Sequence, residues 1–406
     1  NLPTIVSGTG NARTGAGPVI ISASASDGST IDWYANATGG SVLSSGNGVT
    51  TYTTPNISQT TTYYAAARNS TTGCLSVSRT AVVATINGSF SPGSISSDQS
   101  ICSGVVPNSL SSNTDASGGT GSISYQWKSS TSNFQTDSLT ISGATASTYS
   151  PSSLTTTTYF RRNAITSNDG SVYSNIVTIT VNPLPSITLG SVSNINTVAT
   201  SFNLPYTSTA NSPNLYSIST GTPTAMTGFN AISNASLSSS PLSISIPTSS
   251  ANTYNFNITV LNSTTGCVSN ASTFNLVVNT PTINTSGTLN SFTTCTGVAS
   301  SSQNFSVSAS NLSSNLVVTA PTGFEVSNSS NGTYSSSLTL TQTGGTVNAS
   351  TIYIRLSTSA TGTPSGNITC TSSGASTKNV AVSGSVTASN TAGSPSSSPT
   401  LCINTA

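Results

Sequence analysis

The sequence predicts an all-β protein, built as a tandem array of β-sandwich modules joined by short linkers. Three observations predict it: related stretches recur, apolar and polar residues alternate, and turn residues separate the alternating runs about every ten residues. The recurring stretches are 60–87, 155–182 and 251–279, and each opens on Thr or Asn before a Tyr and closes on alternating aliphatics and an Asn. No stretch shows the apolar period of about 3.6 residues over a length that would predict a helix.

In chain order, the alternating runs group into four predicted modules and the beginning of a fifth. Pro-containing junctions and segments rich in Ser, Asn and Gly separate them. The modules comprise residues 1–87, 88–182, 183–280 and 281–388, and a linker with the first strand of a further module follows at 389–406. The clean alternation of the fourth module gives a strand number typical of a sandwich.

Aromatic residues at matching spacing identify the type of sandwich. Trp33 precedes Tyr63 by 30 residues (63 − 33), and Trp127 precedes Tyr159 by 32 residues (159 − 127). A buried Trp on a middle strand and a Tyr near the start of the penultimate strand are typical of immunoglobulin-like sandwiches. The third module has no Trp, but Tyr254 opens its penultimate strand, so we predict all five residues as core aromatics. The Phe residues expected in the third core are Phe202, Phe256 and Phe274.

Composition excludes several classes of protein. The chain has 406 residues, of which only 4% are charged and 34% are hydrophobic. No apolar run approaches the roughly 20 residues of a membrane helix, so we expect no membrane insertion within this chain. The formal net charge is +1 with scattered basic residues, which leaves no basic patch for nucleic acid. The only adjacent basic pair, Arg161 and Arg162, is interpreted as two ordinary strand residues.

Several stretches resemble the repeat modules of giant secreted surface proteins of Bacteroidetes bacteria, including their gliding-motility adhesins. Their immunoglobulin-like repeat resembles IDWYANATGG with TTTYYAAARNSTTGC, and also SGGTGSISYQWKSS. A second module of theirs resembles FTTCTGVASSSQNFSVSASNL with TIYIRLS, and the opening of another resembles SSSPTLCINTA. The resemblance covers nearly the whole chain. It implies export by the type IX secretion pathway and a place on the cell surface or in the medium. Both ends of the chain resemble the interior of a longer array, so we expect further modules beyond them.

The six cysteines are interpreted in the light of that resemblance. No C-x-x-C spacing and no His are present, so we predict no metal site. Export favours disulfides, and the related modules carry a cysteine pair at the positions of Cys295 and Cys370. The resemblance therefore implies a Cys295–Cys370 disulfide.

The pairing of the other four cysteines stays open at this point. In the related repeats the cysteine at the hairpin tip often pairs with one at the start of the module, but Thr14 stands at that place in the first module. Free or small buried thiols are the favoured interpretation of these four. They are Cys74, Cys102, Cys267 and Cys402.

Site chemistry is sparse, and we predict neither catalytic residues nor a cofactor. The absence of His removes the usual general base. Asp27 and Asp32 flank a turn and are expected to be solvated, since a glycosidase pair needs two facing carboxylates in a cleft. The turn SNDGS at 167–171 has too few acids for a calcium site. Lys128 and Lys378 are the lysines available for a Lys–Asn crosslink, which is a weak alternative.

One modification signal stands apart. Asp137-Ser138-Leu139 resembles the Asp-Ser/Thr-aliphatic O-glycosylation motif of this bacterial group, which makes Ser138 a candidate glycosylation site in a polar loop.

These observations favour a non-catalytic segment of a large secreted repetitive adhesin, acting as an extended stalk or fibre in adhesion or gliding. The expected partners are neighbouring modules of the same chain, with surface glycans or other cell-surface proteins as further candidates. One alternative is a glycan- or surface-binding module that uses its hairpin loops. Another is a filament subunit that assembles by donating residues 399–406 as a strand.

Overall fold

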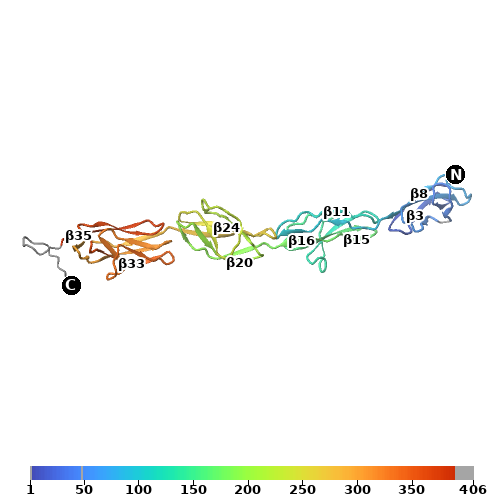
Figure 1. Cartoon of the computed structure of the whole chain (residues 1–406). Helices are drawn as coiled ribbons and strands as arrows, with labels where there is room; N and C mark the ends of the chain where they lie inside the picture. Colours follow the sequence, from blue (N-terminus) through green and yellow to red (C-terminus); the bar gives the residue numbers. More distant parts are fainter. Residues whose placement is uncertain (1, 47–48, 389–406) are drawn as a thin grey trace, which may run out of the picture. The chain divides into compact units, whose positions relative to one another are not determined.

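The computed structural model describes residues 2–46 and 49–388, and it contains no helix in these residues. The all-β prediction is therefore confirmed, and no described helix is available to cross a membrane. The chain divides into two compact units, Asn1–Pro183 and Leu184–Ala406. Unit 1 holds modules 1 and 2, and unit 2 holds modules 3 and 4, in the order that the colours of Figure 1 follow.

Module 1 is a sandwich of two sheets with strand orders β1-β3-β6 and β2-β8-β7-β4-β5. Inward-facing apolar residues of both sheets form one core, in which Trp33 and Tyr63 are 0% and 5% exposed. Trp33 stacks on Tyr52, with ring centroids 5.8 Å apart. The strands are β1 (Ile5–Thr9), β2 (Asn11–Thr14), β3 (Ile20–Ala25), β4 (Ser29–Tyr34), β5 (Val42–Ser44), β6 (Thr51–Thr53), β7 (Thr61–Asn69) and β8 (Thr80–Asn87).

Module 2 repeats this plan, with its main sheet ordered β10-β16-β14-β12-β13, β15 added beside β14, and a small sheet β11-β9 opposite. Trp127 is fully buried in the core, and Arg162 is buried beside it. The Arg162 guanidinium stacks over Tyr125 and donates to the carbonyl of Ser147 at 2.9 Å, which offsets its desolvation. The strands are β9 (Ser94–Ile95), β10 (Gln99–Cys102), β11 (Ser112–Thr114), β12 (Ser124–Ser130), β13 (Leu139–Thr140), β14 (Thr158–Thr166), β15 (Gly170–Tyr173) and β16 (Val177–Asn182).

Module 3 builds its core on phenylalanine in place of Trp. Phe256 and Phe274 stack with centroids 5.3 Å apart, and Phe202 packs against both, as the sequence predicts. Its sheets are β18-β26-β24-β21-β22 with β25 beside β24, β17-β20 and β19-β23. The strands are β17 (Ser186–Leu189), β18 (Ile195–Asn196), β19 (Ser201–Leu204), β20 (Tyr206–Ala210), β21 (Leu215–Thr220), β22 (Ile232–Ser236), β23 (Leu242–Ser245), β24 (Asn252–Asn262), β25 (Cys267–Val268) and β26 (Ser272–Asn279).

Apolar and polar residues alternate most clearly in the strands of module 4. Its two sheets are ordered β27-β29-β33-β31 and β28-β35-β34-β30-β32. Phe292 and Phe324 meet edge to face in its core, with centroids 5.6 Å apart. The strands are β27 (Thr282–Ser286), β28 (Phe292–Cys295), β29 (Gln303–Ser310), β30 (Leu316–Thr319), β31 (Phe324–Ser327), β32 (Ser337–Leu340), β33 (Val347–Leu356), β34 (Ser365–Thr371) and β35 (Lys378–Thr387). The predicted linker and strand at 389–406 lie outside the described residues.

Tyr159 corrects one prediction about the cores. It is only half-buried, whereas the next residue, Phe160, is 2% exposed and belongs to the core. Tyr63 and Phe160 each stand two residues before the position paired with the core Trp, which is Trp33 or Trp127. The sequence repeat instead aligns Tyr63 with Tyr159. Because successive side chains of a strand point to opposite faces, this offset of one residue turns Tyr159 away from the core.

Tyr254, by contrast, lies where the sequence places it. It is 6% exposed, and its hydroxyl donates to the carbonyl of Ser250 at 3.0 Å. A tyrosine that bonds back to the backbone a few residues upstream is the corner arrangement of immunoglobulin-like sandwiches.

The predicted Cys295–Cys370 disulfide is wrong. Cys295 is disulfide-bonded, but Cys370 is a free, buried thiol. The parallel pairing of β28 with β35 sets Cys295 opposite Thr387, whereas Cys370 on β34 lies opposite Lys378. Nine residues of β35 (387 − 378) separate these two positions, about 30 Å at roughly 3.3 Å per residue. A disulfide requires Cα atoms within about 7 Å.

The other cysteines divide differently from the expectation. Cys74 is free and exposed, but Cys102 and Cys267 are disulfide-bonded. The expectation of free thiols rested on the absence of a suitable partner cysteine within their own modules. Cys402 lies outside the described residues. Burial raises the pKa of the Cys370 thiol to about 11, which keeps this thiol protonated and unreactive.

Candidate functional site

Each described module contains a short strand that pairs in parallel with the last strand of that module. The residue after the short strand donates its backbone N–H to the carbonyl of the residue that ends the last strand, at 2.9 to 3.1 Å. This register closes the C-terminal end of every sandwich in the same way. We call the last residue of each short strand the joint position. The joint positions are Thr14, Cys102, Asn196 and Cys295.

In unit 1, the joint position of module 1 contacts the hairpin between β14 and β15 of module 2. The Thr14 hydroxyl donates to the Asp169 carboxylate. The second oxygen of this carboxylate accepts from the backbone N–H of Thr120 at 2.5 Å and from its hydroxyl at 2.8 Å. Thr166 adds a hydroxyl contact at 3.3 Å. One carboxylate therefore joins a strand end of module 1 to two loops of module 2.

The hydrogen-bond donors around Asp169 lower the pKa of its carboxyl group. The hydrogen bond from Thr14 contributes most and those from Thr120 and Thr166 add to it, and together they lower the pKa of Asp169 to about 2. Hydrogen bonds to the charged form of a carboxyl favour that form. Asp169 is thus an acceptor at any ordinary pH, and its contact with Thr14 is charge-assisted. The turn predicted at SNDGS is present, but its acid binds the neighbouring module.

Two glycines allow this close approach. Gly118 and Gly119 have φ angles of +77° and +69°, a conformation that side chains rarely adopt. A Cβ on Gly118 would lie 2.3 Å from the carbonyl oxygen of Ser89 in the linker. The backbone N–H of Gly119 donates to the carbonyl of Gly88 at 2.9 Å. The loop of module 2 therefore lies directly on the chain that connects the two modules.

In unit 2, the same place in the topology carries neutral amides. The side chain of Asn196, at the joint position of module 3, donates to the carbonyl of Asn311 in module 4 at 3.3 Å. The side chain of Asn311 donates in turn to the carbonyl of Thr280 in the linker at 3.2 Å. Asn196 is 9% exposed, so this contact is enclosed by protein. A cavity of about 270 Å³ lies beside it, lined by both Asn residues.

The hairpin between β34 and β35 completes the joint of unit 2. A Cβ on Gly374, at its tip, would lie 2.6 Å from Cγ1 of Val198, which follows the joint position of module 3. It would also lie 3.5 Å from the ring of Pro281 in the linker. We call the hairpin between β14 and β15, the one between β34 and β35, and their equivalents in the other modules the penultimate hairpins. In both units, the penultimate hairpin of the later module lies against the C-terminal end of the earlier module.

Asp27 and Asp32 lie in different surroundings. Asp27 is exposed, whereas Asp32 is fully buried and accepts an ion pair from Arg68 at 2.7 Å. The expectation that both are solvated is wrong for Asp32, because Arg68 on the neighbouring strand β7 compensates its charge. Among residues 2–46 and 49–388, no group of His, Cys, Asp and Glu could hold a metal ion.

Two further candidate residues lie on one face of module 2. Ser138 is exposed, in a loop whose Asp137 carboxylate accepts from the Ser130 hydroxyl at 2.5 Å and the Thr131 N–H at 2.8 Å. The amine of Lys128 donates to the Thr140 hydroxyl at 3.3 Å. Lys128 therefore faces away from the core Trp, because neighbouring residues of a strand point to opposite faces. Glycosylation of Ser138 stays a prediction.

Asp169, Thr14 and Asn196 are the residues that sequence reasoning missed as a site. A signal was present for Thr14, which stands where related repeats carry a cysteine. In this chain the equivalent register is indeed occupied by Cys102 and Cys295. No periodic pattern marks Asp169, because a contact between modules depends on one side chain at a turn.

Comparisons with known proteins find family models for the first two modules. Residues 1–87 match the family model described as "Ig-like domain CHU_C associated", and residues 91–183 match one described as "Domain of unknown function (DUF8696)". No curated protein matches the chain.

Solved structures of tandem modules are similar to it at low identity. The extracellular domains 3–5 of Drosophila OTK share 13% identity, covering 68% of this chain and 97% of that one, with a TM-score of 0.25. Domains A168–A170 of titin share 13%, covering 68% and 99%, with a TM-score of 0.28. The fibronectin(III)-like modules of Clostridium thermocellum CbhA share 15%, covering 45% and 95%, with a TM-score of 0.26. Module 1 is thus similar in sequence to Ig-like domains, and the chain is an array of sandwiches of that fold class.

Proposed function

We propose that this chain is a non-catalytic stalk segment of a long secreted repeat protein. The observation that carries the proposal is the joint position, which recurs in every described module and makes contacts between modules in both units. A stalk requires that the motion of each module relative to the next is limited. Contacts that fix the linker between modules 1 and 2 and between modules 3 and 4 restrict that motion, whereas independent binding domains need no such contacts.

The proposed setting is the bacterial cell surface. Disulfides form and persist in oxidising compartments, and three described cysteines are disulfide-bonded. The match of module 1 to an Ig-like domain model agrees with an extracellular repeat. Together with the resemblance to Bacteroidetes surface proteins, these points support secretion and a role in adhesion or gliding. The partners proposed are the neighbouring modules of the same long protein.

A flexible insertion tests the stalk directly. Six residues of Gly and Ser inserted between Gly88 and Ser89 should separate the two sides of the unit 1 joint without touching either core. Small-angle X-ray scattering of the full chain should then show a smaller mean dimension and a broader distance distribution than the unmodified chain. The same insertion in the exposed loop after Gly143 is the control. Identical scattering from all three chains would contradict the proposal.

The alternative of binding through hairpin loops draws no support from the penultimate hairpins. The four penultimate hairpins carry no aromatic residue at their tips, which are 69–73, 166–170, 262–266 and 372–376. A tip without an aromatic residue offers no stacking surface to a sugar. Strand donation by residues 399–406 falls outside the described residues.

A further inference from the structure

One face of module 2 combines cations, aromatic rings and unused hydrogen-bonding groups. Directly paired residues of neighbouring strands point to the same face of a sheet. Lys128 on β12 pairs with Arg161 on β14, and Asn163 on β14 pairs with Tyr173 on β15. These four residues share the face opposite the core. Together with Phe134 from the neighbouring loop they are called the Arg161 face.

Arg161 is held between two rings on this face. Its guanidinium carbon lies 4.0 Å from the ring centroid of Phe134 and 3.8 Å from that of Tyr173. Stacking on both sides fixes the plane of the guanidinium. Its Nε is buried without a partner, so the donors available to a ligand are those of Nη1 and Nη2. Tyr173 keeps 42% of its surface exposed, so a ring face or edge is available beside the cation.

The loop that carries Phe134 is built to place it there. Asn133 and Phe134 have φ angles of +56° and +59°, in the left-handed region that non-glycine residues rarely adopt. The Asp137 carboxylate holds this turn together by accepting from Ser130 and from the N–H groups of Thr131 and Ser132. These bonds, from the Ser130 hydroxyl above all, hold the pKa of Asp137 far below its usual range. Strained backbone that is held by a dedicated network often marks a functional position.

The cations of the Arg161 face lack carboxylate partners. The ion pairs found in the described residues are Arg68–Asp32 and Arg355–Glu325. Asp137 is the nearest acid in sequence to this face, and its oxygens are occupied by the loop. Of the five N–H donors of Arg161, the structure shows one protein contact, from Nη2 to the Ser138 hydroxyl at 3.5 Å. Oδ1 of Asn163, a residue 7% exposed, also has no hydrogen-bond partner.

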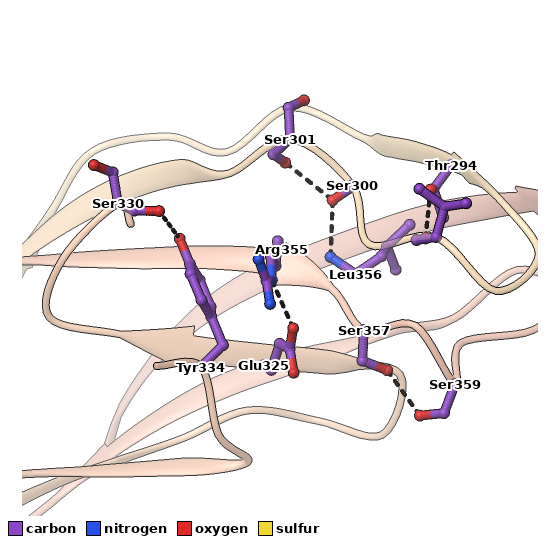
Figure 2. Close-up of polar contacts among 11 residues, drawn as sticks. Thr294, Ser300, Ser301, Glu325, Ser330, Tyr334, Arg355, Leu356, Ser357 and Ser359 are labelled. Carbon is purple, nitrogen blue, oxygen red and sulfur yellow. Dashed lines mark hydrogen bonds and ion pairs between the residues drawn. The ribbon is translucent and has the colours of Figure 1, made fainter. Parts of the chain in front are cut away.

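Module 4 provides a matched arrangement in which the charge is neutralised. Arg355 stacks on Tyr334 with its guanidinium carbon 3.9 Å from the ring centroid, and its Nε donates to Glu325 at 2.6 Å. Figure 2 shows this ion pair beside Tyr334. Both modules therefore display a stacked arginine outside the core, but only module 2 leaves its arginine without an acid.

We propose that the Arg161 face binds carboxylated polysaccharides. A planar guanidinium with unused donors pairs with a carboxylate in two parallel hydrogen bonds, and Lys128 adds a second positive charge on the next strand. The exposed ring of Tyr173 offers an apolar surface to the C–H groups of a sugar ring. A polymer of uronic acid carries a carboxylate on every sugar, so it meets both requirements along its length. This binding does not depend on the proposed stalk.

The test compares two polymers and two arginines in the full chain. Polygalacturonate should bind in a calorimetric titration at low salt, and neutral dextran should not. Arg161→Gln should weaken the binding about tenfold or more, as expected for losing a hydrogen-bonded ion pair. Arg355→Gln changes the net charge equally and should leave binding unchanged. Equal losses in both variants, or no binding of polygalacturonate to either the unmodified chain or Ser138→Ala, would overturn the proposal.

Two further variants guard the interpretation. Lys128→Gln removes a cation whose single protein contact is Thr140, so it should weaken binding severalfold while thermal unfolding stays unchanged. If Arg161→Gln disturbs folding, the effect of Lys128→Gln on polygalacturonate binding still tests the proposal. Dextran sulfate is a polyanion without carboxylates, so it shows whether the face attracts any polyanion. Equal affinity for dextran sulfate and polygalacturonate would contradict the carboxylate assignment. Ser138→Ala tests whether a glycan attached to the chain occupies the face instead, in which case added polymer binds only to this variant.

Discussion

The joints of the two units occupy the same place in the fold but use different chemistry. In unit 1 a carboxylate, Asp169, accepts from Thr14 and from two loops of its own module. In unit 2 two neutral amides, Asn196 and Asn311, link a strand end, a loop and the linker. In both units the parallel short strand therefore fixes where the two modules meet, and the side chain at its end sets how strongly, and at which pH, they stay in contact.

In modules 2 and 4 the residue at the joint position is a disulfide-bonded cysteine. In modules 1 and 3 it is a residue whose side chain forms a hydrogen bond to the next module. Reduction should lower the free energy of unfolding by about 2–5 kcal/mol for each native disulfide. Urea denaturation with and without a phosphine reductant measures this. In alkylation mass spectrometry of the folded, unreduced chain, Cys74 should react and Cys370 should not, since the latter is buried. Alkylation of Cys102 or Cys295 without reductant would contradict the assignment.

The steric side of the unit 1 joint is tested by Gly118→Ala. The new Cβ would lie 2.3 Å from the Ser89 carbonyl oxygen, so the linker must move. Gly143→Ala is the matched control, because its φ of +74° is equally unfavourable but its Cβ meets nothing within 4 Å. Both variants should lose about 1–2 kcal/mol from backbone strain in thermal melts. Only Gly118→Ala should broaden a measured distance between modules 1 and 2, and equal behaviour of both would remove the steric role.

The two joints should respond differently to acid, because only the unit 1 joint contains a carboxylate. The pKa of Asp169 is about 2 in the closed joint, and a free carboxyl titrates near about 3.9. A lowered pKa stabilises the closed joint fully above the free value, and the contribution is lost as the pH falls through about 2. The unit 1 joint should therefore hold at pH 5 and loosen toward pH 2, whereas the amide joint of unit 2 has no group that titrates there. Amide hydrogen exchange checks the contrast when it is measured against pH at Thr120 and at Val198, whose N–H donates to Oδ1 of Asn196 at 3.2 Å.

Asp169→Asn tests the same charge at neutral pH. The amide keeps one acceptor oxygen but replaces the other with a donor, so the contacts with Thr14 and Thr120 cannot both remain. Exchange protection at Thr120 should fall, while the core of module 2 keeps its protection. Asp27→Asn carries the same charge change on an exposed side chain of module 1 and should have no effect. If both variants behaved alike, the joint would not depend on Asp169.

The smallest effect is expected from Asn196→Ala. The hydrogen bond to the Asn311 carbonyl, which crosses the joint, is lost together with the one that Oδ1 accepts from the Val198 N–H, and a neutral hydrogen bond costs about 1 kcal/mol. Asn194→Ala alters an exposed side chain that lines the same cavity and should cost less. Urea midpoints of the two variants give the comparison. A larger loss from Asn196→Ala than from Asp169→Asn would reverse the proposed ranking of the joints.

Much of the fold follows from the sequence. Period-two alternation and the buried residues Trp33 and Trp127 are sufficient to predict the sandwiches, because both depend on burial that each strand encodes locally. The failure at Tyr159 has the same origin. A repeat alignment does not fix strand register to within one residue, and one residue decides which face a side chain takes.

The joints and the disulfides could not be predicted in this way. The Cys295–Cys370 pairing failed because nothing local in the sequence shows that β28 runs parallel to β35, which carries Cys295 to the opposite end of the sheet. Asp32 was assigned to solvent because its partner, Arg68, lies 36 residues away on another strand. Contacts that depend on one pair of side chains far apart in sequence leave no periodic signal.

If the joint of unit 1 fixes module 2 on module 1, the distance between the two modules should be well defined. Cys74 is free and exposed in module 1, and Thr155→Cys adds a second exposed thiol in module 2. Spin labels at both positions of the full chain give the distribution of distances between the modules by pulsed electron resonance. A fixed joint should give one narrow distribution that broadens in the Asp169→Asn chain. A broad distribution in the unmodified joint, unchanged by Asp169→Asn, would contradict it.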